Sequence, residues 1–158
     1  MQKNQEGSVG SQFAGFNCSD LEVQMIPHTQ TSTVCQPSSN STDKPTCSRP
    51  SSSSFSTSEC LRNISADLHY YHVILGSYKQ HSPNISDLTP VMNHTKQLMQ
   101  CLKRRYDPAE EAPPEGSIWT NSSFDNRKVL CKVLKGFVIR TVTINRVLGY
   151  ISAGDHMK

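Results

Sequence analysis

The segment from Phe124 to Tyr150 limits most strongly what this chain can fold into. It contains no proline, and its apolar residues recur at steps of three and four. At about 100° per residue, such steps place side chains on one narrow stripe of a helix. The stripe consists of Leu130, Val133, Leu134, Phe137, Thr141, Ile144 and Leu148. The segment is therefore predicted to be a long helix that buries this stripe in a core.

The run VIRTVTI, residues 138–144, leaves a second interpretation open. Its β-branched residues are also common in half-buried strands. Strands as long as the whole segment are rare, and the flanking lysine-rich turns keep the helical period. The helix is the favoured interpretation.

The opposite face of this helix is not the lysine and glutamate mixture of a purely solvated face. It presents Ile139, Val142, Thr143, Arg146 and Tyr150. An arginine among apolar and aromatic side chains is typical of the centre of a protein–protein interface. An ordinary exposed arginine beside scattered apolar residues is the alternative. Arg140 falls at the edge of the core stripe, where its stem can pack while its guanidinium pairs or reaches solvent.

The same periodicity predicts two further helices. The first begins near Ser58 and Glu59, with a serine cap, and runs to about His81. The second covers about Asp87 to Lys103, with Pro90 tolerated in its first turn. Long connections rich in serine, threonine, proline or acidic residues precede the first and follow the second. This pattern predicts an all-α bundle with crossover connections, in which a fourth helix is expected but not found.

Several function classes find no support in the sequence. A net charge of +3 with dispersed lysine and arginine does not indicate a nucleic-acid-binding protein. No apolar run approaches the roughly 18 residues of a membrane-spanning helix. The serine-hydrolase, P-loop, dinucleotide and zinc-protease motifs are missing, so no catalytic site or cofactor is expected. His69 and His72 lie one turn apart but lack a third ligand, so no metal site is expected.

Sequons and cysteines indicate the secretory route. Six N-x-S/T sequons occur where composition predicts about two by chance. They lie at Asn17, Asn40, Asn63, Asn84, Asn93 and Asn121. Six cysteines, none in a C-x-x-C pair, fit dispersed disulfides. The N-terminal residues MQKNQEGSVGSQFAGF contain no apolar signal-peptide core, so we expect the natural start to be missing or altered.

The run FVIRTVTINRVLGY resembles the last helix of the interleukin-12 alpha subunit family, whose pattern is F-x-I-R-x-V-T-I-x-R-V-x-x-Y. Nine positions match without a gap: Phe137, Ile139, Arg140, Val142, Thr143, Ile144, Arg146, Val147 and Tyr150. Supporting similarities are TSTVC at 31–35, a D-L-x-x-Y helix after Cys60, LMQ at 98–100 and VLC at 129–131. The resemblance covers about Phe16 to Ile151.

The resemblance implies a long-chain four-helix cytokine bundle with up-up-down-down topology. The amphipathic first helix of such a bundle is missing upstream of Cys18. The resemblance also implies a secreted cytokine alpha subunit that pairs with the interleukin-12 beta subunit and activates the interleukin-12 receptor on T and natural killer cells. A secreted binding or decoy glycoprotein that does not signal is the alternative.

The family also implies roles for individual residues. The last helix would dock on the beta subunit with Arg146 at the centre of the contact, and with Arg140 among the partner-binding residues. By resemblance Cys18 pairs with Cys131, and Cys35 pairs with Cys60. Cys47 is favoured as the intersubunit cysteine. Cys101 matches no family cysteine and is either free or a second partner for Cys47.

These expectations divide the chain into four segments. Residues 1–17 are an unstructured or aberrant N-terminus, and residues 18–58 are a Ser/Thr-rich crossover loop tethered by disulfides. Residues 59–152 form the helical bundle, and residues 153–158 are a tail.

Overall fold

The computed structural model describes residues 13–24, 29–36, 56–83, 88–104 and 118–154. Within these ranges the chain is helical, with no strand. The elements are a 3-10 helix η1 (Cys18–Asp20) and four α-helices: α2 (Thr31–Val34), α3 (Thr57–His81), α4 (Thr89–Lys103) and α5 (Ser123–Ala153). The all-α prediction is confirmed, and the strand interpretation of residues 138–144 is wrong because α5 is helical throughout.

Helix α3 begins two residues before its predicted start. The hydroxyl of Ser56 accepts a hydrogen bond from the Glu59 amide at 3.3 Å, which satisfies one of the free donors of the first turn. The helix ends at His81, as predicted. Helix α4 begins at Thr89 and ends at Lys103, with Pro90 in its first turn, while its predicted start at 87 lies outside the described residues.

Helix α5 has an N-terminal and a C-terminal cap that explain its length. The hydroxyl of Ser122 accepts from the Asp125 amide at 3.2 Å. At the other end Gly154 adopts a left-handed conformation, with φ 73°, and its amide donates to the Ile151 carbonyl. The helix therefore extends beyond Tyr150 to Ala153.

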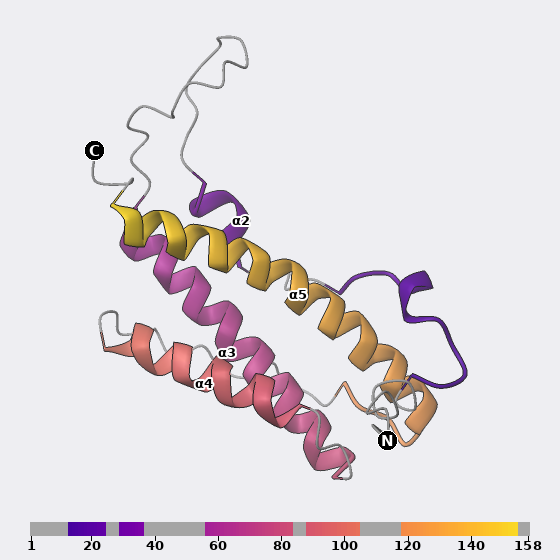
Figure 1. Ribbon diagram of the computed structural model, residues 1–158. Coiled ribbons are helices and arrows are strands. Elements are labelled where there is room, and N and C mark those ends of the chain that lie inside the picture. Colours follow the sequence, from indigo (N-terminus) through magenta and orange to yellow (C-terminus); the bar gives the residue numbers. More distant parts are fainter. Residues whose placement is uncertain (1–12, 25–28, 37–55, 84–87, 105–117, 155–158) are drawn as a thin grey trace, which may run out of the picture.

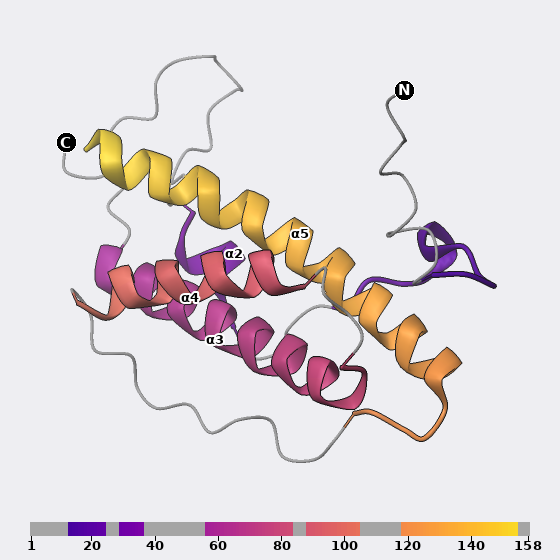
Figure 2. The same ribbon diagram turned by 60° about the horizontal axis from the view of Figure 1, so that its bottom comes forward.

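The long helices are arranged around α3. In Figure 1, α3 lies between α4 and α5, and it contacts both of them. Figures 1 and 2 show α4 and α5 running in the direction opposite to α3. This is the arrangement expected for the last three helices of an up-up-down-down bundle. The described part of the segment expected to lack structure, residues 13–17, lies outside any helix, and residues 1–12 are not described.

The core forms where α3 faces α5 and α4. Tyr71 of α3 and Phe137 of α5 are fully or nearly fully buried, with ring centroids 4.6 Å apart. Of the predicted α5 stripe, Leu130, Val133, Phe137 and Ile144 are buried, whereas Leu134, Thr141 and Leu148 are partly buried. Arg140 and Val147 are buried as well. The buried stripe of α5 is therefore rotated slightly from the predicted one.

Two parts of the core lie in segments predicted as loops. Trp119 is buried against Tyr78, at 4.8 Å between centroids, and its indole donates to the Ser77 hydroxyl at 2.7 Å. The short helix α2 lies within the long loop predicted for residues 18–58 and buries the side chain of Thr31. Neither Trp119 nor α2 lies in a segment with a periodic apolar pattern, so the sequence did not predict their burial. Tertiary contacts hold both in the core.

Candidate partner-binding face of α5

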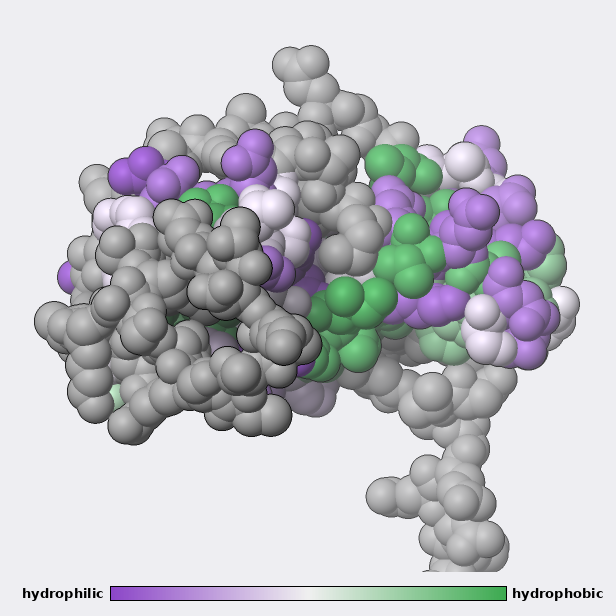
Figure 3. Space-filling model, turned by 90° about the horizontal axis from the view of Figure 1, so that it is seen from above, coloured by the Kyte–Doolittle hydropathy of each residue, from purple (hydrophilic) through white to green (hydrophobic). Residues whose placement is uncertain are grey.

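The exposed face of α5 consists of Val138, Ile139, Val142, Thr143, Arg146 and Tyr150. Its large apolar members are far more exposed than core residues, at 62% for Val138, 48% for Ile139, 56% for Val142 and 47% for Tyr150. Arg146 is exposed and Thr143 is half-buried. The side of the molecule seen in Figure 3 carries a cluster of hydrophobic side chains between hydrophilic ones. Apolar side chains gathered in this way are typical of interaction sites.

The threonines of this region turn their polar atoms to their own helix. The hydroxyl of Thr143 donates to the Ile139 carbonyl at 3.4 Å, and that of Thr141 donates to the Val138 carbonyl at 2.8 Å. Hydroxyls satisfied in this manner do not require hydrogen bonds from a partner. The exposed face can therefore pack against an apolar surface despite Thr143, and the neighbouring Thr141 is satisfied in the same way.

Arg146 is the charged residue within this face. In the described part of the chain it makes no ion pair or hydrogen bond. Its guanidinium carries five donors in a rigid fork that matches a carboxylate. The exposed face thus combines apolar side chains with one cation that has no partner among the described residues. Val138 was missing from the residues predicted for this face, although its place one turn before Val142 would have indicated it.

Arg140 occupies a different environment from Arg146. Its side chain is only 5% exposed, and its Nε lies 3.3 Å from Oδ2 of Asp67, which is fully buried on α3. The hydroxyl of Thr31 donates to the same carboxylate oxygen at 2.5 Å. Asp67 thus joins α2, α3 and α5. The resemblance places Arg140 among the partner-binding residues, whereas this position favours the structural role that its place at the stripe edge also allows.

The charges of this buried cluster affect Tyr71, which lies beside it. Burial, and then the negative charge of Asp67, raise the pKa of Tyr71 to about 12, while Arg140 opposes the shift. The Tyr71 hydroxyl has no hydrogen-bond partner among the described residues. Tyr71 therefore remains neutral near neutral pH.

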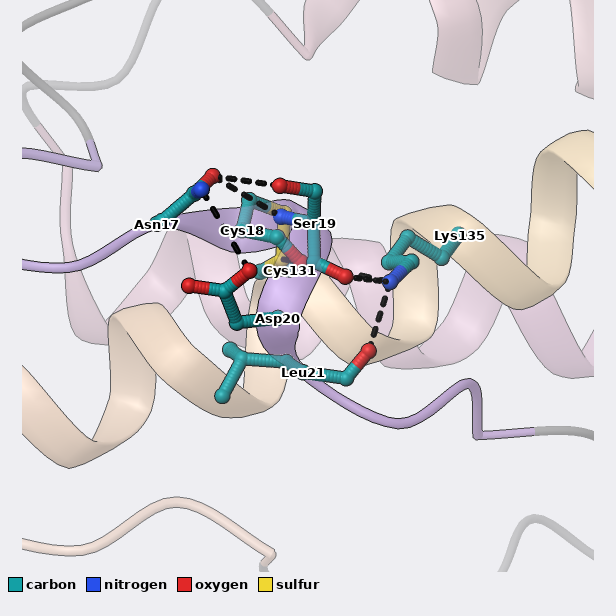
Figure 4. Close-up of a disulfide and its surroundings, with 7 residues drawn as sticks. All are labelled: Asn17, Cys18, Ser19, Asp20, Leu21, Cys131 and Lys135. Atoms are coloured by element: carbon teal, nitrogen blue, oxygen red, sulfur yellow. Dashed lines mark hydrogen bonds between the residues drawn. A yellow bond between two sulfur atoms is a disulfide. The ribbon is translucent and has the colours of Figure 1, made fainter.

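Disulfides fasten the N-terminal segments to the helices. Cys18 is bonded to Cys131 of α5, and Cys35 to Cys60 of α3, the two pairs that the resemblance implies. Figure 4 shows the first disulfide beside Lys135, whose ammonium group donates to three backbone carbonyls, of Cys18, Ser19 and Leu21, at 3.3, 3.1 and 2.5 Å. The segment at η1 is thus held to α5 by both a covalent bond and a charge-assisted contact.

Cys101 is exposed and free on α4. Cys47, expected to form the intersubunit bond, lies outside the described residues.

An aromatic cluster holds residues 13–16 against the first turn of α5. Phe16 packs edge-on against Phe124 at 5.6 Å, and the Lys128 ammonium lies 4.5 Å from the centroid of the Phe124 ring. Arg127 donates to the Ala14 carbonyl at 2.7 Å. The cluster was not predicted, because its members lie more than a hundred residues apart in sequence.

The described sequon asparagines fall into two groups. Asn17, Asn93 and Asn121 are exposed, whereas Asn63 is half-buried and hydrogen-bonded to the segment before α2. Asn40 and Asn84 lie outside the described residues.

The described ranges hold no group of three or more histidine, cysteine, aspartate or glutamate side chains that could bind a metal ion. None of their helices is long and apolar enough to cross a membrane. His69 and His72 are half-buried on α3.

Comparison with known proteins identifies the family. The family model for the interleukin-12 alpha subunit matches residues 18–154, which include every helix of the structure. The chain belongs to this family. It is 27% identical over 160 residues to interleukin-12 subunit alpha of Mus musculus, an alignment that covers 87% of this chain and 73% of the mouse protein. The comparison with solved structures found no match.

Membership of the interleukin-12 alpha subunit family places the chain among cytokine subunits rather than enzymes. The three long helices and two disulfides agree with the helical cytokine bundle that the resemblance implies.

Proposed function

We propose that this chain is a secreted cytokine alpha subunit that docks on an interleukin-12 beta subunit through the exposed face of α5. The observation that carries the proposal is the exposure of Val138, Ile139, Val142 and Tyr150 around Arg146. Burying apolar surface contributes about 25 cal/mol per Å², so a partner that covers these side chains gains free energy.

Arg146 would form the specific contact at the centre of this docking surface. We propose that its guanidinium binds a carboxylate in an acidic pocket of the beta subunit. A bidentate bond of this kind fixes the geometry of the pair, and the surrounding apolar side chains exclude the water that would otherwise weaken it. Ile139, Val142, Thr143 and Tyr150 would contact the partner around it. Arg140 would support the surface from beneath, through Asp67.

A covalent link would complete the assembly. Cys47 would form a disulfide with the beta subunit, which keeps the two chains together after secretion into an oxidising compartment. The exposed asparagines Asn93 and Asn121 are proposed glycan acceptors, as is the exposed Asn17, whose side chain caps η1. Asn40 and Asn84 are further proposed acceptors. The assembled heterodimer would then engage the interleukin-12 receptor on T and natural killer cells.

The test of this function is co-expression of the chain with an interleukin-12 beta subunit, followed by a receptor reporter assay on cells that carry the interleukin-12 receptor. A signalling subunit gives a heterodimer that activates the reporter. A decoy, the alternative function, assembles with the beta subunit but leaves the reporter silent. Secretion of the chain without any association with the beta subunit would contradict the proposal.

The covalent link is tested separately with Cys47→Ser and Cys101→Ser. The first variant is expected to abolish the disulfide-linked band on a non-reducing gel, and the second, which removes the exposed cysteine of α4, to leave it unchanged.

A further inference from the structure

Asn63 differs from the other described sequon asparagines in that its side-chain amide is used to connect two segments of the fold. It lies on α3, one turn after Glu59, and is half-buried. Its Oδ1 accepts a hydrogen bond from the backbone amide of Gln30 at 3.0 Å, and its Nδ2 donates to the backbone carbonyl of Glu59 at 3.0 Å. Asn93, by comparison, is exposed on α4.

The contact with Gln30 belongs to a two-point attachment of α2. One turn further along α3, Asp67 accepts from the hydroxyl of Thr31, the residue after Gln30. Asn63 and Asp67 thus hold consecutive residues at the start of α2, while the Cys35–Cys60 disulfide holds its end. The side chain of Gln30 makes no capping hydrogen bond to this short helix. The position of α2 against α3 therefore depends on the contacts of Asn63 and Asp67 and on the disulfide.

From this geometry we propose that Asn63 carries no glycan in the folded protein, although it begins an N-x-S sequon, because its amide fastens α2 to α3. Glycosylation would form a bond from Nδ2 to C1 of N-acetylglucosamine, with loss of one Nδ2 proton and release of the lipid pyrophosphate that carries the sugar. The resulting secondary amide is planar and trans, which puts C1 on the same side as Oδ1. C1 would therefore lie next to the oxygen that accepts from the backbone amide of Gln30.

A sugar at Asn63 would therefore crowd the start of the docked α2. A chain that acquires the glycan before folding would keep α2 away from α3, and Thr31 would lose its carboxylate partner. Asn93 has no such conflict, because its exposed side chain is held by no other segment in the described ranges. It provides the matched control on a helix of the same bundle.

Mapping the acceptor sites tests the proposal directly. The full chain is secreted from animal cells behind an added leader, and the folded protein with its Cys35–Cys60 bond is treated with peptide N-glycosidase in heavy-oxygen water. This converts each glycosylated asparagine into a heavy aspartate. We expect the label at Asn93 and none at Asn63. Heavy aspartate at position 63 in this disulfide-bonded protein would overturn the proposal.

Two variants that both destroy the sequon separate the two roles of Asn63. Asn63→Gln also displaces the amide, whereas Ser65→Ala leaves the amide in place. We expect neither to change the apparent mass, and Asn63→Gln to melt several degrees below Ser65→Ala. Loss of one glycan mass in both variants, or equal melting temperatures, would contradict the proposal.

Discussion

Replacing Asp67 by alanine removes the carboxylate that joins α2, α3 and α5. The side chain of Arg140 is 5% exposed and that of Asp67 is fully buried, with 3.3 Å between Nε and Oδ2. After the replacement the Arg140 guanidinium stays buried without that partner, and Thr31 loses its acceptor. The structure thus predicts a large loss of stability from a single substitution.

The magnitude of this loss of stability follows from the burial of both charges. Removing one partner of a buried ion pair costs about 3–5 kcal/mol, because the remaining charge is left in a poorly solvated site. The free energy of unfolding of a small domain is about 5–15 kcal/mol, so the expected loss is a large fraction of the total. The matched double variant Asp67→Leu, Arg140→Met replaces both charges by apolar groups of similar size. It should lie within about 1–2 kcal/mol of the parent chain.

Urea denaturation followed by circular dichroism provides the measurement. The Asp67→Ala transition should shift to much lower urea with an unchanged slope, and the double variant should recover most of the loss. A loss below about 1 kcal/mol for Asp67→Ala would mean that Arg140 reaches solvent or another partner, and the structural role assigned to this pair would be refuted.

Three further substitutions test other contacts of the fold. Gly136→Ala should lower the melting temperature, because the added Cβ would overlap the Gln24 carbonyl oxygen. Alanine is otherwise the better helix former by about 1 kcal/mol, so an unchanged or higher melting temperature would contradict this overlap. Gly149→Ala is the control, since its Cβ meets nothing within 4 Å, and it should raise the free energy of unfolding by roughly 0.5–1 kcal/mol. Burial, then the charges of Lys96 and His69, lower the pKa of His72 below its ordinary 6.5. Protonation of His72 therefore favours the unfolded chain. The stability that neutral His72 contributes above pH 6.5 is lost as the pH falls from 6.5 toward the lower pKa of His72 in the folded chain. His72→Gln should flatten this decline in urea titrations at a series of pH values, and an equally steep decline in the variant would assign the effect to other groups.

Periodicity in the sequence predicted the three long helices because each buries a stripe of its own residues. The predicted ends of α3 at His81 and of α4 at Lys103 agree with the structure. Helix α5 begins one residue before its predicted start and ends three residues after its predicted end. The exposed residues of α5 could also be predicted, since a helix that buries Val133, Phe137 and Ile144 must present Val142 and Arg146 on another side.

The features that the sequence did not predict depend on contacts between distant residues. Thr31 and Trp119 lie in segments without an apolar period, and they are buried because Asp67 and Ser77 supply hydrogen-bond partners. The burial of Arg140 likewise depends on the carboxylate of another helix, which periodicity within α5 cannot reveal. The hydrogen bond from the Gln30 backbone amide to Asn63 is a further contact of this kind.

The most direct test of the proposed docking surface is the dissociation constant of the alpha and beta subunits, measured in a Cys47→Ser background that keeps the internal disulfides. Arg146→Ala should weaken binding by about 2–5 kcal/mol, roughly 30-fold to several thousand-fold, because it leaves the partner's carboxylate buried without a cation. Arg62→Ala, at an exposed arginine of α3, is the matched control and should bind like the parent chain. Equal affinities for the parent and Arg146→Ala would contradict the assignment of the exposed face of α5 as the docking surface.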